Sequence, residues 1–349
     1  MFILYTTENM LYRICENASS NDALDCWYKI IVNTKQVALS TNELDITNTW
    51  IQQLHKMGIT IYAEKEWLDK MFSSNDIIIE EPTAAYMLDI PQSACDKLKH
   101  DFGVLCYSTD KTISIPIFTG RGWHIDTSDT DKEKSWKALL SDLSIPSNAI
   151  IIVDRYLFSS SAGETIEDSF FNLKQILELL LPQSINNGIF DVSLFFDFSS
   201  INFNKDKKPD GTTIDMAYLA KRVNKIKKDI NRAYPFSLSL ISVSSNCLNY
   251  DKTHNRRIIS NYYIVRAEHK IKAYNERRGP LCNQDLSFSY IFSDGLYDRS
   301  TIPEKSKDST LNALKETLES AQKAKNPEVI IYRNGQKIDI SDYTNILLK

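Results

Sequence analysis

The chain has 349 residues, 42% of them hydrophobic and 25% charged, with a formal net charge of −4 at pH 7. This composition is typical of a globular protein, and the length allows two domains because single hydrophobic cores stop growing near about 250–300 residues. A transmembrane helix is not expected, because the sequence lacks a run of about 18 apolar residues. The start, Met1–Thr7, lacks the basic segment of a signal peptide and instead predicts a first β-strand.

Residues 1–145 alternate short apolar runs with amphipathic segments, which predicts an α/β domain of unassigned function. The expected strands are Phe2–Thr6, Trp27–Val32, Ile59–Ala63, Ile77–Ile79, Met87–Ile90 and Gly103–Tyr107. The expected helices are Asn42–Met57, Glu64–Phe72 and Pro91–His100.

The segment 109–148 is expected to connect two domains. It contains a hairpin-like stretch, Thr112–Phe118, and a helix around Ser135–Leu143. Pro146 is a plausible stop after that helix, so the boundary is placed near residue 145. Gly120 and Gly122 lack a third glycine and do not open a helix, so they predict a hairpin turn rather than a phosphate-binding loop.

Residues 146–349 predict a second α/β domain, with a mixed sheet flanked by helices. The expected strands are Ala149–Asp154, Val192–Asp197, Phe236–Val243, Arg257–Val265 and Val329–Tyr332, with a turn at Asn334-Gly335. The expected helices are Thr165–Leu181, Thr213–Tyr234 and Ser309–Lys323.

Charge is unevenly distributed along the chain. The segment from Lys205 to Arg278 holds 17 Lys and Arg but only 7 Asp and Glu, whereas the remainder is strongly acidic. Such segregation indicates either a face that meets an anion or an acidic region that docks on a basic one.

The segment His254–Asn261 carries the most specific pattern in the chain: a histidine, Arg256 two residues later, and Asn261 five residues after that. Residues two apart on a strand point to the same face, so His254 and Arg256 can meet one phosphate group. The spacing is that of H-x-K-x4-D, with the lysine replaced by arginine and the acid by asparagine.

This pattern resembles the phospholipase D-like superfamily, and in particular its degenerate members with a single motif, such as the C-terminal domain of MIT-domain proteins. The early run Val153–Leu157 resembles the opening strand of the same proteins. The resemblance implies a phospholipase D-like domain over residues 146–349, with His254 as nucleophile, Arg256 as phosphate clamp and Asn261 in the place of the acid. Active members use two motifs, so activity here would require a homodimer.

Two other groups of residues bear on function. Asp154 and Asp197 end two predicted parallel strands and could together hold Mg²⁺, or could cap neighbouring helices. A second set consists of basic residues in and near the predicted helix 213–234 and the predicted strand Arg257–Val265. These residues could contact nucleic acid or form solvated surfaces. This basic set comprises Lys221, Arg222, Lys225, Lys228, Arg257, Arg266 and Lys270.

The leading hypothesis is a non-catalytic, cytoplasmic module that binds nucleic acid or a phosphorylated ligand, as a component of a bacterial anti-phage defence system. The first alternative is an active nuclease or phosphodiesterase that uses His254 in a homodimer. The second is a protein–protein interaction subunit. The six cysteines show no C-x-x-C pair and the five histidines lie far apart, so neither a zinc site nor any other cofactor is expected.

Overall fold

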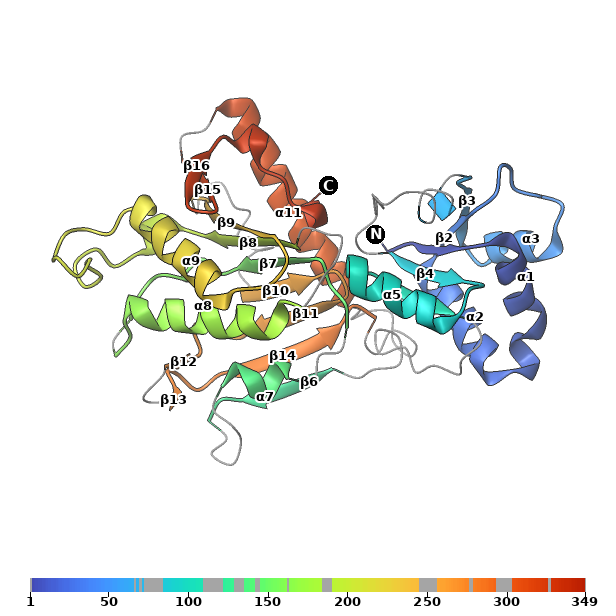
Figure 1. The fold of residues 1–349 in the computed structure, drawn as a ribbon, viewed down its shortest axis with the longest axis horizontal. Helices are drawn as coiled ribbons and strands as arrows, with labels where there is room; N and C mark the ends of the chain where they lie inside the picture. Colours follow the sequence, from blue (N-terminus) through green and yellow to red (C-terminus); the bar gives the residue numbers. More distant parts are fainter. Residues whose placement is uncertain are drawn as a thin grey trace.

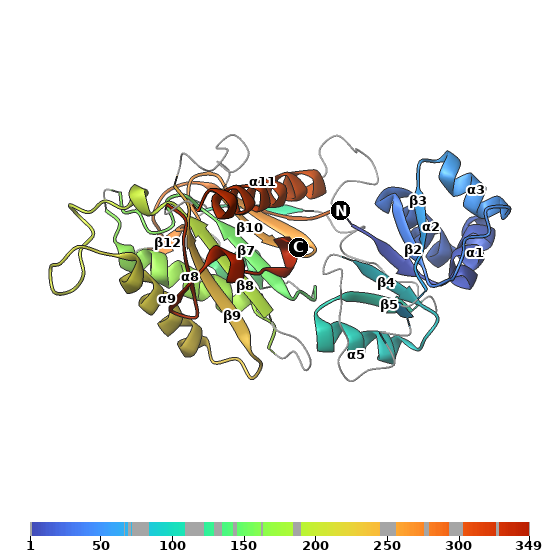
Figure 2. The same ribbon diagram turned by 90° about the horizontal axis from the view of Figure 1, so that it is seen from above.

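The computed structural model describes residues 2–65, 67–68, 71, 84–108, 122–128, 135–141, 145–161, 163–183, 190–244, 256–275, 279–292, 303–325 and 328–348. These residues form a parallel sheet and a larger mixed sheet, which lie side by side with helices against each (Figures 1 and 2). The predicted α/β fold with a mixed C-terminal sheet flanked by helices is confirmed. None of the helices in the described part of the chain combines the length and apolarity needed to span a bilayer.

The parallel sheet has the strand order β3-β2-β1-β4-β5. Its strands are β1 (Leu4–Thr6), β2 (Gln36–Leu39), β3 (Thr60–Ala63), β4 (Ala85–Leu88) and β5 (Leu105–Ser108). Apolar side chains of α1 (Glu8–Asn17), α2 (Asp22–Thr34) and α3 (Thr49–Lys56) join a core cluster with one face, and α5 (Gln92–Phe102) joins a separate cluster with the other. The sheet is therefore covered on both faces, as expected for parallel strands.

The mixed sheet has the order β16-β15-β9-β8-β7-β10-β11-β14-β6. At its centre β7 (Ala149–Val153), β8 (Phe190–Phe196) and β9 (Phe236–Ser242) are parallel. The antiparallel strands are β6 (Trp123–Asp126), β10 (Arg256–Ser260), β11 (Tyr263–Ala267), β14 (Asp285–Tyr290), β15 (Ile330–Arg333) and β16 (Gln336–Ile338). The short ribbon of β12 (Tyr274–Asn275) and β13 (Gly279–Pro280) lies outside this sheet.

Helices cover both faces of the mixed sheet. Side chains of α7 (Trp136–Leu140), α8 (Ile166–Leu180) and α9 (Met216–Ile230) join the larger core cluster, while α11 (Pro303–Ala324) joins a cluster on the opposite face. Figure 1 shows α8 and α9 in front of the central strands. A capping box starts α8, where Asp168 accepts a hydrogen bond from the backbone N–H of Thr165 at 2.8 Å.

The two sheets are joined by buried polar contacts. The Tyr262 hydroxyl accepts from the backbone N–H of Leu105 at 3.0 Å and donates to the carbonyl of Ala84 at 2.9 Å. The Asn148 amide donates to the carbonyl of Phe102 at 3.1 Å. One hydrophobic cluster also includes side chains from both sheets, so the predicted division into residues 1–145 and 146–349 stays a prediction.

Two secondary-structure predictions are wrong. The segment Trp27–Val32 lies within helix α2 instead of forming a strand, because Trp27, Ile30 and Ile31 are buried at helical spacing. The strand predicted for Arg257–Val265 is two antiparallel strands, β10 and β11, which reverse direction at Asn261-Tyr262. The predicted strand Ile77–Ile79 and the hairpin Thr112–Phe118 lie outside the described residues.

Candidate anion-binding site

The carboxyl ends of β7 and β8 form one edge of the mixed sheet, at the end remote from the junction, because β7 begins beside Asn148. Asp154 follows β7 and is buried. One carboxylate oxygen accepts the backbone N–H of Tyr156 at 2.9 Å, and the other accepts that of Ile271 at 2.9 Å. Burial raises the pKa of Asp154. This carboxylate therefore anchors two loops to the strand end.

Asp197 follows β8 on the neighbouring strand and is also buried. Its Oδ1 accepts the backbone N–H of Ser199 at 2.9 Å, and its Oδ2 lies 3.5 Å from Nε of Arg155. Asp154 and Asp197 therefore follow the ends of two adjacent strands, and both carboxylates have protein partners. Within the described ranges no three His, Cys, Asp or Glu side chains gather where they could hold a metal ion.

An arginine–tyrosine–arginine group lies at this edge. The guanidinium carbons of Arg155 and Arg256 lie 5.1 Å and 5.7 Å from the ring centroid of Tyr156. All three residues are partly exposed. Arg256 Nη1 donates to the carbonyl of Glu268 at 3.2 Å, which fixes the start of β10 against the loop after β11. The group presents two delocalised cations and an aromatic ring.

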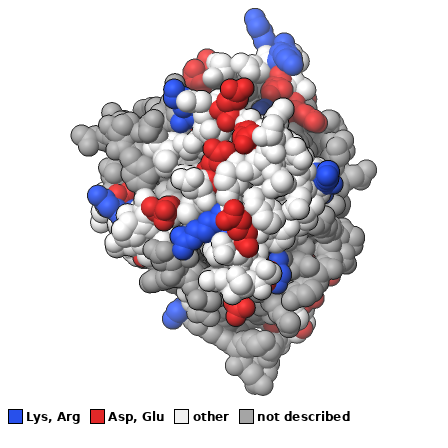
Figure 3. Space-filling view, turned by 90° about the vertical axis from the view of Figure 1, so that its right-hand side faces the viewer, with Lys and Arg blue, Asp and Glu red and all other residues white. Residues whose placement is uncertain are grey.

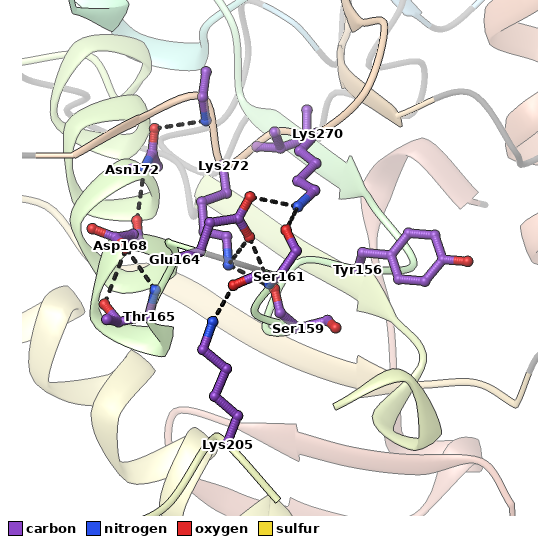
Figure 4. Close-up of polar contacts among 12 residues, drawn as sticks. Tyr156, Ser159, Ser161, Glu164, Thr165, Asp168, Asn172, Lys205, Lys270 and Lys272 are labelled. Carbon is purple, nitrogen blue, oxygen red and sulfur yellow. Dashed lines mark hydrogen bonds and ion pairs between the residues drawn. The ribbon is translucent and has the colours of Figure 1, made fainter. Parts of the chain in front are cut away.

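A buried ion cluster lies beside this group (Figure 4). Glu164 is 4% exposed and receives Lys270 Nζ at 2.6 Å and Lys272 Nζ at 3.2 Å. The Lys272 side chain is fully buried and also donates to the carbonyl of Ser159 at 2.6 Å. Burial by itself would raise the pKa of Glu164, but the hydrogen bond from Lys270, that from Ser161 and the charge of Lys272 outweigh it and lower the pKa to about 2. Burial lowers the pKa of Lys272.

Ser161 connects the cluster to further lysines. Its hydroxyl accepts from Lys270 at 2.5 Å, and its carbonyl accepts from Lys205 in the loop after β8. Lys205 is exposed. The loop between β7 and α8 is therefore held by lysines from two other segments of the chain, as Figure 4 shows.

Only two of the three predicted motif residues, Arg256 and Asn261, are described, and the structure places these two apart. His254 lies outside the described residues. Arg256 opens β10, whereas Asn261 follows its last residue, a separation on the order of 16 Å along a strand. Asn261 is fully buried at the junction, where its Oδ1 accepts the backbone N–H groups of Asn148 at 3.1 Å and Ala149 at 3.2 Å. Asn261 therefore stabilises the junction between the two sheets.

The other predicted basic residues divide by location. Lys221, Lys225 and Lys228 are exposed on α9, whereas Arg222 forms a bidentate ion pair with Glu167. Lys270 belongs to the buried cluster, and Arg257 and Arg266 lie toward the face that α11 covers. These residues are therefore spread over several surfaces.

Sequence reasoning missed Glu164, Lys272 and Arg155 as members of this edge. Glu164 and Lys272 are 108 positions apart, and no local pattern links an acid before a helix with a lysine after a strand. Arg155 directly follows Asp154, and that adjacency to a predicted strand end was the one available signal.

Comparisons of the chain with models of known families, with curated proteins and with solved structures found no match.

Proposed function

We propose that the chain is a non-catalytic module that binds a phosphate-bearing ligand, with single-stranded nucleic acid as the leading ligand class. The observation that carries this proposal is the placement of Arg155 and Arg256 at 5.1 Å and 5.7 Å from the ring centroid of Tyr156, at the carboxyl ends of parallel strands. Arginine donates pairs of hydrogen bonds to phosphate oxygens, and an aromatic ring offers a stacking surface to a base. Open α/β sheets commonly bind ligands at this edge.

The polar contacts favour binding over chemistry. Asp154 accepts two backbone N–H groups, and Asn261 is buried at the opposite end of β10. A general base or a metal ligand needs oxygen atoms that can reach a substrate. The proposal retains the resemblance to degenerate phospholipase D-like domains, in which Arg256 would keep the phosphate-clamping part of the motif.

Surface charge supports placing the ligand at this edge. Figure 3 shows the opposite end of the molecule, formed by the parallel sheet and its helices, where described Lys and Arg side chains are scattered among Asp and Glu. At the carboxyl ends of β7 and β8, Arg155, Arg256 and Lys205 are all partly or fully exposed. These exposed cations would attract a polyanion to the carboxyl ends of β7 and β8.

The test is binding of labelled single- and double-stranded DNA and RNA across a salt series, with and without EDTA. Native protein and Arg256→Gln are compared with Arg13→Gln, which removes an exposed arginine from α1 beside the parallel sheet. We expect salt-dependent binding without cleavage, weakened about tenfold by Arg256→Gln and unchanged by Arg13→Gln.

Other outcomes would replace the proposal. Cleavage that survives EDTA and is lost in His254→Ala would establish the metal-independent phosphodiesterase, acting as a homodimer. Cleavage lost on chelation would point to Asp154 and Asp197. Absence of any nucleic-acid binding would favour the protein–protein interaction subunit. A cytoplasmic location, expected from the scattered cysteines, and a part in bacterial anti-phage defence, suggested by analogy with degenerate nuclease folds, complete the proposal.

A further inference from the structure

A second pair of arginines lies on the opposite face of β10 and β11. Arg257 and Arg266 are directly opposed in the antiparallel register of these strands. Ile259 and Ile264, two residues further along each strand, belong to the hydrophobic cluster that includes α11. Because side chains alternate between faces of a strand, both arginines point to the α11 face and away from Tyr156.

Arg257 is the more deeply buried of the two, with 6% of its surface exposed. Its Nη1 donates to the carbonyl of Ser306 at 3.0 Å and to the hydroxyl of Thr310, both in α11. Its buried Nε has no hydrogen-bond partner in the described part of the chain. Burial, together with the charge of Arg266, lowers the pKa of Arg257 to about 10. The guanidinium is thus held in place with donor capacity unused.

Arg266 is partly exposed and carries more unused capacity. Its guanidinium makes no hydrogen bond or ion pair with any described residue, and its Nε is buried. Burial lowers its pKa as well. Like charges directly opposite each other on neighbouring strands repel, so this arrangement is unfavourable unless an anion lies between them.

The same row of the sheet continues with polar side chains. Ser287 of β14 is opposite Arg266, and His124 of β6 is opposite Ser287. Ser287 is partly exposed and His124 is exposed, so this row reaches solvent. Asp285 lies two residues from Ser287 on the same face and, among the described ion pairs, makes none with Arg266. An anion could therefore approach along the row from the β6 edge.

We propose that Arg257 and Arg266 form a binding site for a phosphate dianion, either inorganic phosphate or the terminal phosphate monoester of a larger ligand. The partly exposed guanidinium of Arg266 can donate paired hydrogen bonds to phosphate oxygens, and the buried guanidinium of Arg257 places a second positive charge opposite it. Because Arg257 is almost completely buried, a terminal phosphate could approach it but the backbone of a duplex could not. This site lies on the other face of the sheet from Tyr156 and goes beyond the function proposed above.

The test is titration of the full chain with inorganic phosphate at constant ionic strength, with chloride as the balancing anion. Binding is measured by calorimetry and by the shift in Tm. Native protein is compared with Arg266→Gln, Arg266→Lys and the control Arg13→Gln, at an exposed position of α1, and circular dichroism checks that each variant is folded. We expect saturable binding that raises Tm, a loss of about tenfold or more in affinity for Arg266→Gln, and native affinity for Arg13→Gln.

Arg266→Lys should bind with intermediate affinity, because lysine keeps the charge but not the paired donors. A short DNA strand with a 5′-phosphate, compared with the same strand ending in a hydroxyl, distinguishes the two sources of the phosphate. Absence of saturable phosphate binding, or binding that Arg266→Gln leaves intact, would overturn the proposal. Either result would leave the salt-dependent nucleic-acid binding attributed to Arg256 to its own test, because that test uses nucleic acid and the Arg256→Gln variant.

Discussion

The two ends of strand β10 differ in how their polar groups are used. At the Asn261 end the side chain is fully buried, and the backbone carbonyl of Asn261 accepts from Lys307 at 2.8 Å. At the Arg256 end the side chain is partly exposed and lies over Tyr156. One end holds the two sheets together and the other faces solvent. A motif that looks continuous in sequence thus combines a structural residue with a ligand-accessible one.

Charged side chains at the carboxyl ends of β7 and β8 fall into a buried group and a solvent-accessible group. Glu164 and Lys272 neutralise each other away from water, while Arg155 and Arg256 remain reachable. Buried ion pairs are costly to break because removing one partner leaves an uncompensated charge. Substitutions within the buried pair should therefore affect stability, and substitutions at the accessible arginines should affect binding.

The largest expected effect comes from Glu164→Gln. The substitution leaves Lys272 fully buried without its carboxylate, so we expect the free energy of unfolding to fall by about 3–5 kcal/mol, measured by urea denaturation at pH 7. Glu167→Gln is the matched control, because its ion pair with Arg222 is exposed and should contribute less than about 1 kcal/mol. Equal losses in the two variants would contradict the distinction between buried and accessible charge.

Asn261→Ala should be the next most damaging change. It removes the acceptor of two buried backbone N–H groups, those of Asn148 and Ala149, and we expect a loss of about 2–4 kcal/mol in the free energy of unfolding. Asn9→Ala, at an exposed position of α1, should change stability by less than about 0.5 kcal/mol. A stable Asn261→Ala variant that loses ligand binding would instead assign Asn261 to the site.

Acid should weaken the buried cluster in a defined pH range. The pKa of Glu164 is about 2 in the folded state, against about 4.3 for an unfolded chain, so its stabilisation is present above about pH 4.3 and is lost as pH falls toward 2. We expect a loss of up to about 2 kcal/mol from this group at pH 3, seen as the difference between native protein and Glu164→Gln in urea titrations. Parallel pH profiles for the two proteins would contradict this expectation.

The smallest expected effect concerns the accessible arginines. If Arg256 contacts one phosphate, Arg256→Gln should reduce the slope of log affinity against log salt concentration by about 1. The free energy of unfolding should change little, because Arg256 makes one hydrogen bond to a described residue. An unchanged slope, with binding retained, would move the nucleic-acid surface away from this strand end.

Local patterns allowed much of the fold to be predicted. The apolar spacing in α8 and α9 and the run of buried residues in β7 are each visible within one segment. Helix α2 was mistaken for a strand because its segment Trp27–Val32 is rich in residues that also favour strands. The break between β10 and β11 was missed because Asn261 was assigned to the motif, although asparagine favours turns and neither glycine nor proline stands beside it.

The candidate site was less predictable than the fold. Arg256 was identified from its motif, and Asp154 and Asp197 from their positions at strand ends. The Glu164–Lys272 pair and the opposed arginines Arg257 and Arg266 depend on contacts between distant segments and on strand register. A single sequence specifies register only through the burial pattern of paired strands, and both arginines interrupt that pattern.

The Tyr262 hydroxyl, which hydrogen-bonds to backbone groups beside β4 and β5, affects when the parallel sheet can finish folding during synthesis. A ribosome releases β4 and β5 more than 150 residues before it releases Tyr262, which hydrogen-bonds to the Leu105 N–H and the Ala84 carbonyl beside those strands. Until then both backbone groups need water as a hydrogen-bond partner, so the parallel sheet stays hydrated around Ala84 and Leu105. The parallel sheet can therefore reach its final packing only after Tyr262, in the turn between β10 and β11, has been synthesised.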